Sequence, residues 1–176
     1  FVHALKVEKD KSIYHLVKES ELYDKKLKMY KVNSPFNGVP LEIGRAKVFT
    51  SGWLENESVW LHMEYKYMLE LLRAGMYDEF FAAFRNVLVP FMEPAVYKRS
   101  ILQNSSFIAS SAYPDKDSHG RGFVARLSGA TAEFLDMWIR MTTGKEIFSL
   151  DKAGKLCFKL SPILPSWLFR KGKFTF

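Results

Sequence analysis

The chain has 176 residues, 48% of them hydrophobic and 15% aromatic, a composition that favours a domain with a buried core over a disordered tail. Its formal charge of +7 gathers mainly towards the two ends, and residues 54–93 carry more acids than bases, which argues against the basic stripe of a nucleic-acid-binding protein. The single cysteine, Cys157, excludes an internal disulfide framework, and no apolar run approaches the roughly 20 residues that cross a bilayer.

The first half of the chain predicts two paired helices after an irregular start. Residues 1–50 show only a short helical pattern near 12–23 and a turn-rich run at 33–40. Residues 56–73 predict a helix with Asn56 as its cap and Gly75 just past its end. A second helix over residues 77–89 follows after a few residues and stops before Pro90, so the two are expected to pack antiparallel.

The second half predicts two more helices and a short tail of strands. A third helix is expected near residues 100–111, and a fourth begins after Ser128-Gly129 and ends at Gly144. The alternating, proline-containing stretch 147–176 predicts short strands. Helices paired without intervening strands favour an all-α barrel or bundle, with residues 1–146 as its helical part and 147–176 as a β tail. The chain, which begins with Phe1, reads as a piece of a longer protein.

Three groups of residues are candidates for binding. His62 lies near a helix start, where an imidazole can donate to an anion, although a histidine hydrogen-bonded inside the core fits the same pattern. Ser128 and Gly129 open a helix whose free N–H groups would cradle phosphate, and ordinary capping by Ser128 explains them equally. The hydroxyls of residues 105–111 suit either sugar hydroxyls or tight packing.

The sequence gives little support for a general acid–base pair or for a metal site. The carboxylates of residues such as Glu55 and Asp115 have no spacing that singles out a general acid and a base, and they read more simply as solvated charges. The four histidines include no helical pair and no HExxH spacing, so no metal is predicted.

Several segments, in order, resemble the cellobiose phosphorylase-like family of inverting glycoside phosphorylases. Residues 52–62, Gly-Trp-Leu-Glu-Asn-Glu-Ser-Val-Trp-Leu-His, are similar to the family segment that reads Lys-Glu-Asn-Gly-Gly and places a histidine six residues after the asparagine. Residues 73–75 and 126–132 are similar to the motifs that come next in the family's sequence. The resemblance runs from about residue 22 to the end. Residues 99–106 are most similar to the larger members, including those that act on β-glucans.

The resemblance implies a fold and a reaction. The fold would be the C-terminal part of an (α/α)6 barrel, and the reaction a reversible, inverting phosphorolysis of a β-glucoside or β-oligoglucan to α-glucose 1-phosphate. His62 and Ser128, with Gly129, match the family's phosphate-binding positions. The resemblance also implies that Glu55, Asn56 and Ser110 bind the sugar, although Ser110 or a neighbour stands where the family has a sugar-binding glutamine. Leu54 stands where the family has a lysine that faces the acceptor, which argues against cellobiose itself.

The family's catalytic aspartate has no counterpart in this chain, so the general acid is expected upstream and no catalytic residue is predicted here. The parent protein would be a cytoplasmic glycosyl-transferring enzyme, inactive as this fragment alone. Inorganic phosphate would be its co-substrate, without a cofactor. The remainder of the barrel would be its partner, and a homodimer is a further option. The alternatives are a barrel glycoside hydrolase and a non-catalytic carbohydrate-binding or interaction module.

Overall fold

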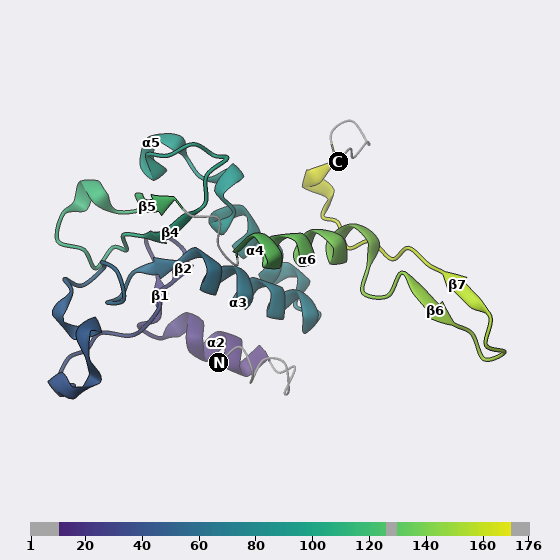
Figure 1. Ribbon diagram of the computed structural model, residues 1–176, viewed down its shortest axis with the longest axis horizontal. Coiled ribbons are helices and arrows are strands. Elements are labelled where there is room, and N and C mark those ends of the chain that lie inside the picture. Colours follow the sequence, from purple (N-terminus) through teal and green to yellow (C-terminus); the bar gives the residue numbers. More distant parts are fainter. Residues whose placement is uncertain (1–10, 126–129, 170–176) are drawn as a thin grey trace. The chain divides into compact units, whose positions relative to one another are not determined.

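The computed structural model describes residues 11–125 and 130–169, and the chain divides into two compact units at residues 133 and 134. The described helices and strands of the first unit lie in the order α2 (Lys11–Glu19), β1 (Tyr23–Asp24), β2 (Met29–Tyr30), β3 (Val59–Trp60), α3 (Leu61–Arg73), α4 (Tyr77–Val87), α5 (Pro94–Tyr97), β4 (Ser105–Ile108) and β5 (Gly122–Ala125). Helix α6 (Ala130–Thr143) begins in the first unit and continues into the second, which also holds β6 (Phe148–Leu150) and β7 (Leu156–Phe158) (Figure 1).

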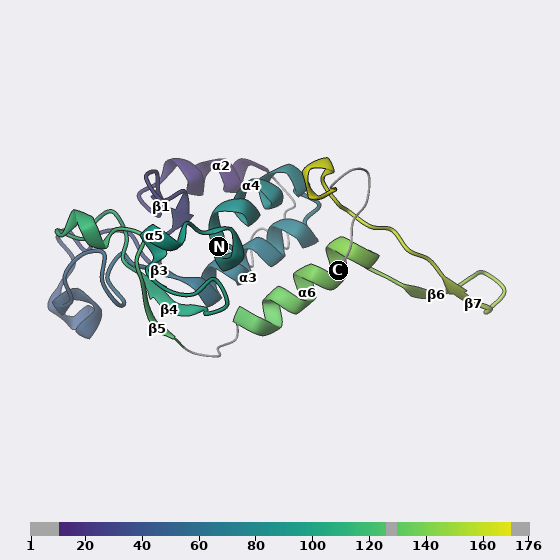
Figure 2. The same ribbon diagram turned by 90° about the horizontal axis from the view of Figure 1, so that it is seen from above.

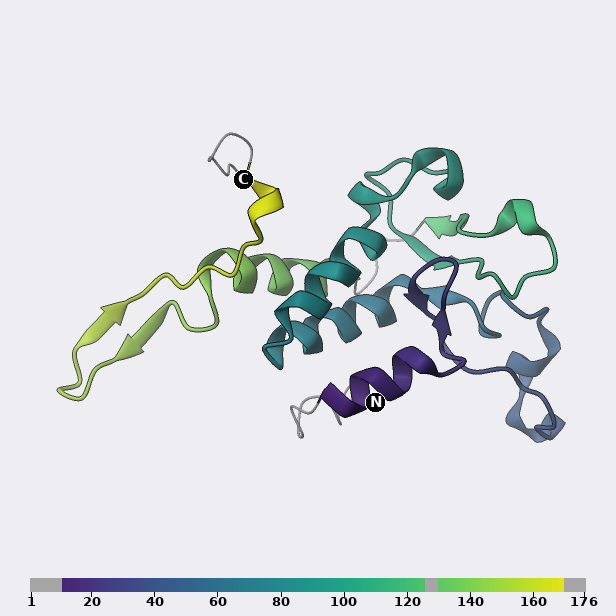
Figure 3. The ribbon, with the colours of Figure 1, turned by 180° about the vertical axis from the view of Figure 1, so that it is seen from behind.

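The helices α3 and α4 form the antiparallel hairpin that the sequence predicts (Figure 3). Gly75 ends α3 in the left-handed conformation, with φ at +78°. Its N–H donates to Leu72 O at 3.2 Å, and the N–H of Met76 donates to Leu71 O at 3.0 Å, which is a Schellman motif. The facing sides of the two helices supply much of the core, namely Leu61, Tyr65, Met68, Leu72, Phe80, Phe84 and Val87.

A three-stranded antiparallel sheet in the order β3-β4-β5 lies at the start of α3. Its register pairs Trp60 with Phe107 and Phe107 with Phe123, so these three side chains share one face. Val59 pairs with Ile108, both fully buried, on the opposite face. The sheet therefore carries an aromatic row on one side and part of the core on the other.

The expectation of an incomplete (α/α)6 barrel is wrong. The described residues form a mixed α/β arrangement with three small antiparallel sheets, β1-β2, β3-β4-β5 and β6-β7. The segment expected as a third helix contains the strand β4, the centre of its sheet. Ser105 and Phe107 point to one side and Ser106 and Ile108 to the other, a period of two that a strand requires.

The second unit contains most of α6 and the β6-β7 hairpin (Figure 2). Gly144 ends α6 with φ at +97°, and a Cβ there would lie 2.8 Å from Ser161 O. The chain returns past this helix end, where the N–H of Ser161 donates to Thr143 O at 2.9 Å and that of Ile163 to Met141 O at 2.7 Å. Across the ranges 11–125 and 130–169, no helix has the length and apolar character to cross a membrane.

Candidate functional site

A tight turn at residues 53–56 precedes α3. The N–H of Trp53 donates to Asn56 O and the N–H of Asn56 donates to Trp53 O, each at 3.1 Å. Leu54 sits in the left-handed region with φ at +46°, which is uncommon for a residue with a branched side chain. The turn therefore adopts a backbone conformation that its own residues do not favour.

The residues after the turn hold it in place. The Ser58 hydroxyl and the Trp60 indole N–H both donate to Leu54 O, the latter at 2.9 Å. Glu57 is also left-handed, with φ at +59°, and its N–H donates to Asn33 Oδ1 at 2.8 Å. Backbone strain of this kind persists where the surroundings over-determine it, and it clusters at ligand sites. Residues 53–60 thus form a preorganised loop.

A buried ion pair connects this loop to the strand pair β1-β2. Lys31 Nζ lies 2.6 Å from Glu57 Oε1, and the two side chains are 10% and 6% exposed. Burying two charges is costly unless they are paired, so each side chain requires the other. The pair ties the loop to a chain segment 26 residues away.

The two predicted sugar-binding residues of the loop differ in accessibility. Glu55 is partly exposed, and its carboxylate forms a 2.5 Å ion pair with Arg45. Asn56 is 5% exposed, and its Nδ2 donates to Phe49 O at 2.7 Å, while its Oδ1 has no hydrogen-bond partner within the described chain. Glu55 can reach a ligand directly, whereas Asn56 supports the loop from inside.

His62, predicted to bind phosphate, is the second residue of α3 and is half-buried. Its ring meets the Trp60 ring edge-on, with centroids 5.6 Å apart. Burial, and then the Lys66 charge, lower the pKa of His62 below its usual value of 6.5, while Glu133 opposes them. The imidazole is therefore mainly neutral at pH 7 and offers one N–H donor.

The first turn of α6 lies within electrostatic reach of that imidazole. Glu133 belongs to this turn and acts on His62, and Ala130, the first residue of α6, is fully buried. Ser128 and Gly129, the other two predicted phosphate-binding residues, lie outside the described residues. Their contact with phosphate stays a prediction, but the helix that they precede begins in the same region as α3.

Ser110, the third predicted sugar-binding residue, is fully buried just after β4. Its N–H donates to Gly52 O at 3.2 Å, its carbonyl accepts from Tyr113 N at 3.1 Å, and its hydroxyl accepts from Ala112 N at 3.2 Å. The structure thus places Ser110 at a junction between two loops, with no exposed surface of its own.

An aromatic cluster beside the loop was not anticipated from the sequence. The Trp53 ring centroid lies 4.4 Å from that of Phe123, 5.0 Å from that of Phe107 and 5.2 Å from that of Tyr113. Trp60 stacks on Phe107 at 6.0 Å and so joins the cluster to His62. Residues 100–111, which include Phe107, were expected to form a helix, and no element was predicted around Phe123.

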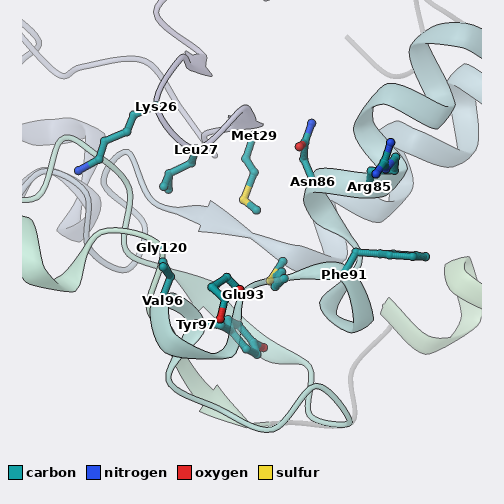
Figure 4. A pocket seen from close by; sticks show the side chains of 11 residues that line it. Lys26, Leu27, Met29, Arg85, Asn86, Phe91, Glu93, Val96, Tyr97 and Gly120 are labelled. Atoms are coloured by element: carbon teal, nitrogen blue, oxygen red, sulfur yellow. The ribbon is translucent and has the colours of Figure 1, made fainter.

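A separate cleft of about 240 Å³ opens on another part of the first unit (Figure 4). Met29, Phe91 and Val96 contribute apolar surface, and Lys26 and Arg85 lie among its charged lining residues. None of the residues predicted to bind phosphate or sugar lines it. Among the side chains of residues 11–125 and 130–169, no group of three His, Cys, Asp or Glu gathers as metal ligands would.

No family model matches the chain, and no curated protein matches it either. The resemblance to cellobiose phosphorylase-like proteins consequently rests on the order and spacing of its motifs.

Proposed function

We propose that the chain supplies part of the phosphate and sugar site of an inverting glycoside phosphorylase, acting on a β-glucoside or β-oligoglucan with release of α-glucose 1-phosphate. The proposal depends on the local site and does not require a barrel. It is supported by one observation above all, the electrostatic coupling of Glu133 in the first turn of α6 to His62 in the first turn of α3.

That coupling matters because each helix start is the positive end of a helix dipole. An anion near both would be stabilised by the two dipoles and would accept from the His62 imidazole. Residues 126–129 precede α6 in the sequence and residues 130–131 open it, so the second predicted phosphate motif leads directly into this region. Two motifs about 65 residues apart in sequence would then act on one anion.

The chemistry suits an inverting displacement. Phosphate replaces the base-activated water of a hydrolase, so the protein needs a single general acid and a socket that aligns the nucleophile. His62 and Ser128 would hold and orient phosphate, and Glu55 would face sugar hydroxyls from the preorganised loop. The general acid would come from a part of the enzyme outside this sequence.

Phosphate binding to the 176-residue chain tests the proposal directly. The NMR signals of the His62 ring should shift saturably as inorganic phosphate is added. Ser128→Ala should weaken the apparent affinity about tenfold, the value of one hydrogen bond to a charged group. His62→Ala, measured by calorimetry, should weaken it at least as much. His15→Ala, at an exposed position of α2, is the matched control and should change nothing.

Activity belongs to the longer enzyme that carries the general acid. There, both His62→Ala and Ser128→Ala should raise KM for phosphate while product formation remains dependent on phosphate. Phosphate dependence that is the same in both variants as in the wild type contradicts the proposal, as does product release without phosphate.

The aromatic cluster favours a second candidate, a non-catalytic carbohydrate-binding module. Half-buried Trp53 and Trp60 offer the flat apolar surfaces on which pyranose rings stack, beside the polar Glu55. Such a module would bind β-oligoglucan equally with and without phosphate. In a phosphorylase site, phosphate and sugar would affect each other's affinity, so calorimetry with both ligands separates the two functions.

A further inference from the structure

The cleft of about 240 Å³ is walled mainly by three segments that are distant in the sequence (Figure 4). Its lining includes residues 26–29 from the β1-β2 turn and β2, residues 85–86 from the last turn of α4, and residues 91–97 from the chain around α5. All three segments belong to the first unit. The cleft shares no residue with the predicted phosphate and sugar positions, so a ligand bound there would serve a separate purpose.

Contacts outside the cleft hold its walls in place. The Asp24 carboxylate accepts from the N–H groups of Lys26 and Leu27, both at 3.0 Å, and so fixes the β1-β2 turn. On the opposite wall, the Tyr97 hydroxyl donates to Gln103 O at 2.7 Å. Because the walls do not depend on a ligand for their position, the cleft is preformed, as small-molecule sites usually are.

The interior of the cleft is apolar. Leu27, Met29, Met92 and Val96 contribute side chains, and thioethers adapt well to ligands of irregular shape. Gly120 lets the walls approach, because a Cβ there would lie 2.7 Å from Val96 Cγ1 and 3.5 Å from Leu27 Cδ2. A cavity of about 150 Å³ holds benzene. This cleft therefore has room for one branched or aromatic side chain with a few polar atoms attached.

Two opposite charges at the cleft are available to a ligand. Lys26 Nζ donates to His119 Nδ1 at 2.7 Å, which leaves two of its three N–H groups. Glu93 accepts from the N–H of Ala95 at a long 3.4 Å. Within residues 11–125 and 130–169, neither Lys26 nor Glu93 forms an ion pair. Arg85, the third charged lining residue, already has an interaction within the chain.

We propose that the cleft binds a free apolar α-amino acid of about the size of leucine or methionine. Its carboxylate would accept from Lys26 and its ammonium would donate to Glu93, each through a charge-assisted hydrogen bond. Its side chain would lie against Met29 and Met92. A ligand with a single charge would leave one of the two lining charges without a partner, so the cleft selects a zwitterion.

Calorimetry of the 176-residue chain with L-leucine tests the proposal. We expect saturable binding with a Kd below about 1 mM. N-acetyl-L-leucine lacks the ammonium and L-leucinamide lacks the carboxylate, so each should bind about tenfold or more weakly, the value of one hydrogen bond to a charged group. L-alanine keeps both charges and should also bind more weakly, because it loses the apolar contact.

Variants of the two charged residues locate the site. Lys26→Met and Glu93→Gln should each weaken L-leucine binding about tenfold or more. Glutamine keeps the oxygen that accepts from Ala95, so α5 should stay capped. Lys25→Met, in the same turn but outside the lining, is the matched control and should change nothing.

The analogues and the variants together assign each charge to its partner. Glu93→Gln should not weaken N-acetyl-L-leucine any further, and Lys26→Met should not weaken L-leucinamide any further. L-leucine should also leave the NMR signals of His62 unmoved, which separates this site from the proposed phosphate site. The proposal is overturned by L-leucine that does not saturate, by either analogue binding as tightly as L-leucine, or by equal binding in the wild type, Lys26→Met and Glu93→Gln.

Discussion

Glu133, in the first turn of α6, acts on His62, in the first turn of α3, and raises a pKa that burial first and Lys66 second hold below 6.5. The protonation of the imidazole is therefore set first by burial and then by two charges of opposite sign, one on α6 and one on its own helix. An anion bound at His62, as proposed, would add a further negative charge, so its binding would be coupled to proton uptake.

The two charges give a paired prediction for the His62 pKa. Glu133→Gln removes a charge that opposes this lowering and should lower the pKa further. Lys66→Met removes a like charge and should raise it. An NMR titration of the His62 ring protons measures both shifts. If neither variant moves the pKa, or if both move it the same way, the proximity of the α6 start to His62 is contradicted.

Glu64 gives a prediction for stability against pH. This carboxyl is completely buried, and its two oxygens accept from the N–H of Tyr30 at 3.2 and 3.1 Å. Burial raises its pKa from 4.5 to about 8. A raised folded-state pKa stabilises the fold fully below pH 4.5, and the stabilisation is lost as pH rises through about 8. Glu64→Gln does not titrate, so it should gain stability relative to the wild type across this window.

The size of this effect is set by the pKa difference, which corresponds to an upper limit of about 5 kcal/mol in the free energy of unfolding. Urea unfolding of both proteins between pH 5 and 9 measures it. A constant difference between wild type and Glu64→Gln over that range would mean that Glu64 does not carry its proton into the neutral range.

The sequence predicted the elements that rest on local signals. Helix α3 ends at the Gly75 motif and α6 runs from Ala130 to the residue before Gly144, as expected from their caps. The predicted fold class is wrong because β4 was expected to be helical, and its alternating serines and apolar residues also suit a tightly packed helix. The residue pattern of β4 alone does not show that β3 and β5 pair with it.

The candidate site was predictable in its residue types but not in its geometry. A helix start was expected at Asn56, whereas α3 begins at Leu61 because residues 53–60 form the self-bonded loop. That loop depends on left-handed Leu54 and Glu57, conformations that no propensity favours. It also depends on Lys31, whose pairing with Glu57 spans 26 residues.

The two ion pairs of the loop should differ sharply in their effect on stability. Glu57→Gln leaves the buried Lys31 charge unpaired and should cost about 3–5 kcal/mol. Glu55→Gln breaks the pair with Arg45, whose side chain is 80% exposed, and should cost less than about 1 kcal/mol. Denaturant unfolding at neutral pH measures both. Equal costs would show that the Lys31–Glu57 pair is hydrated in solution.

Gly52 gives a last prediction, which concerns the junction between the loop and Ser110. A Cβ at Gly52 would lie 2.3 Å from Tyr113 N and 2.7 Å from Tyr113 Cα, and its φ is +81°. Gly52→Ala therefore combines a conformational cost of about 1–2 kcal/mol with a clash against backbone that cannot move aside. Gly38→Ala is the control, since its φ of +71° imposes the same conformational cost while nothing lies within 4 Å. The difference in unfolding free energy between the two variants isolates the close approach of Gly52 to Tyr113. Because that approach sets the position of the aromatic cluster, Gly52→Ala should also change the fluorescence of Trp53, whereas Gly38→Ala should not.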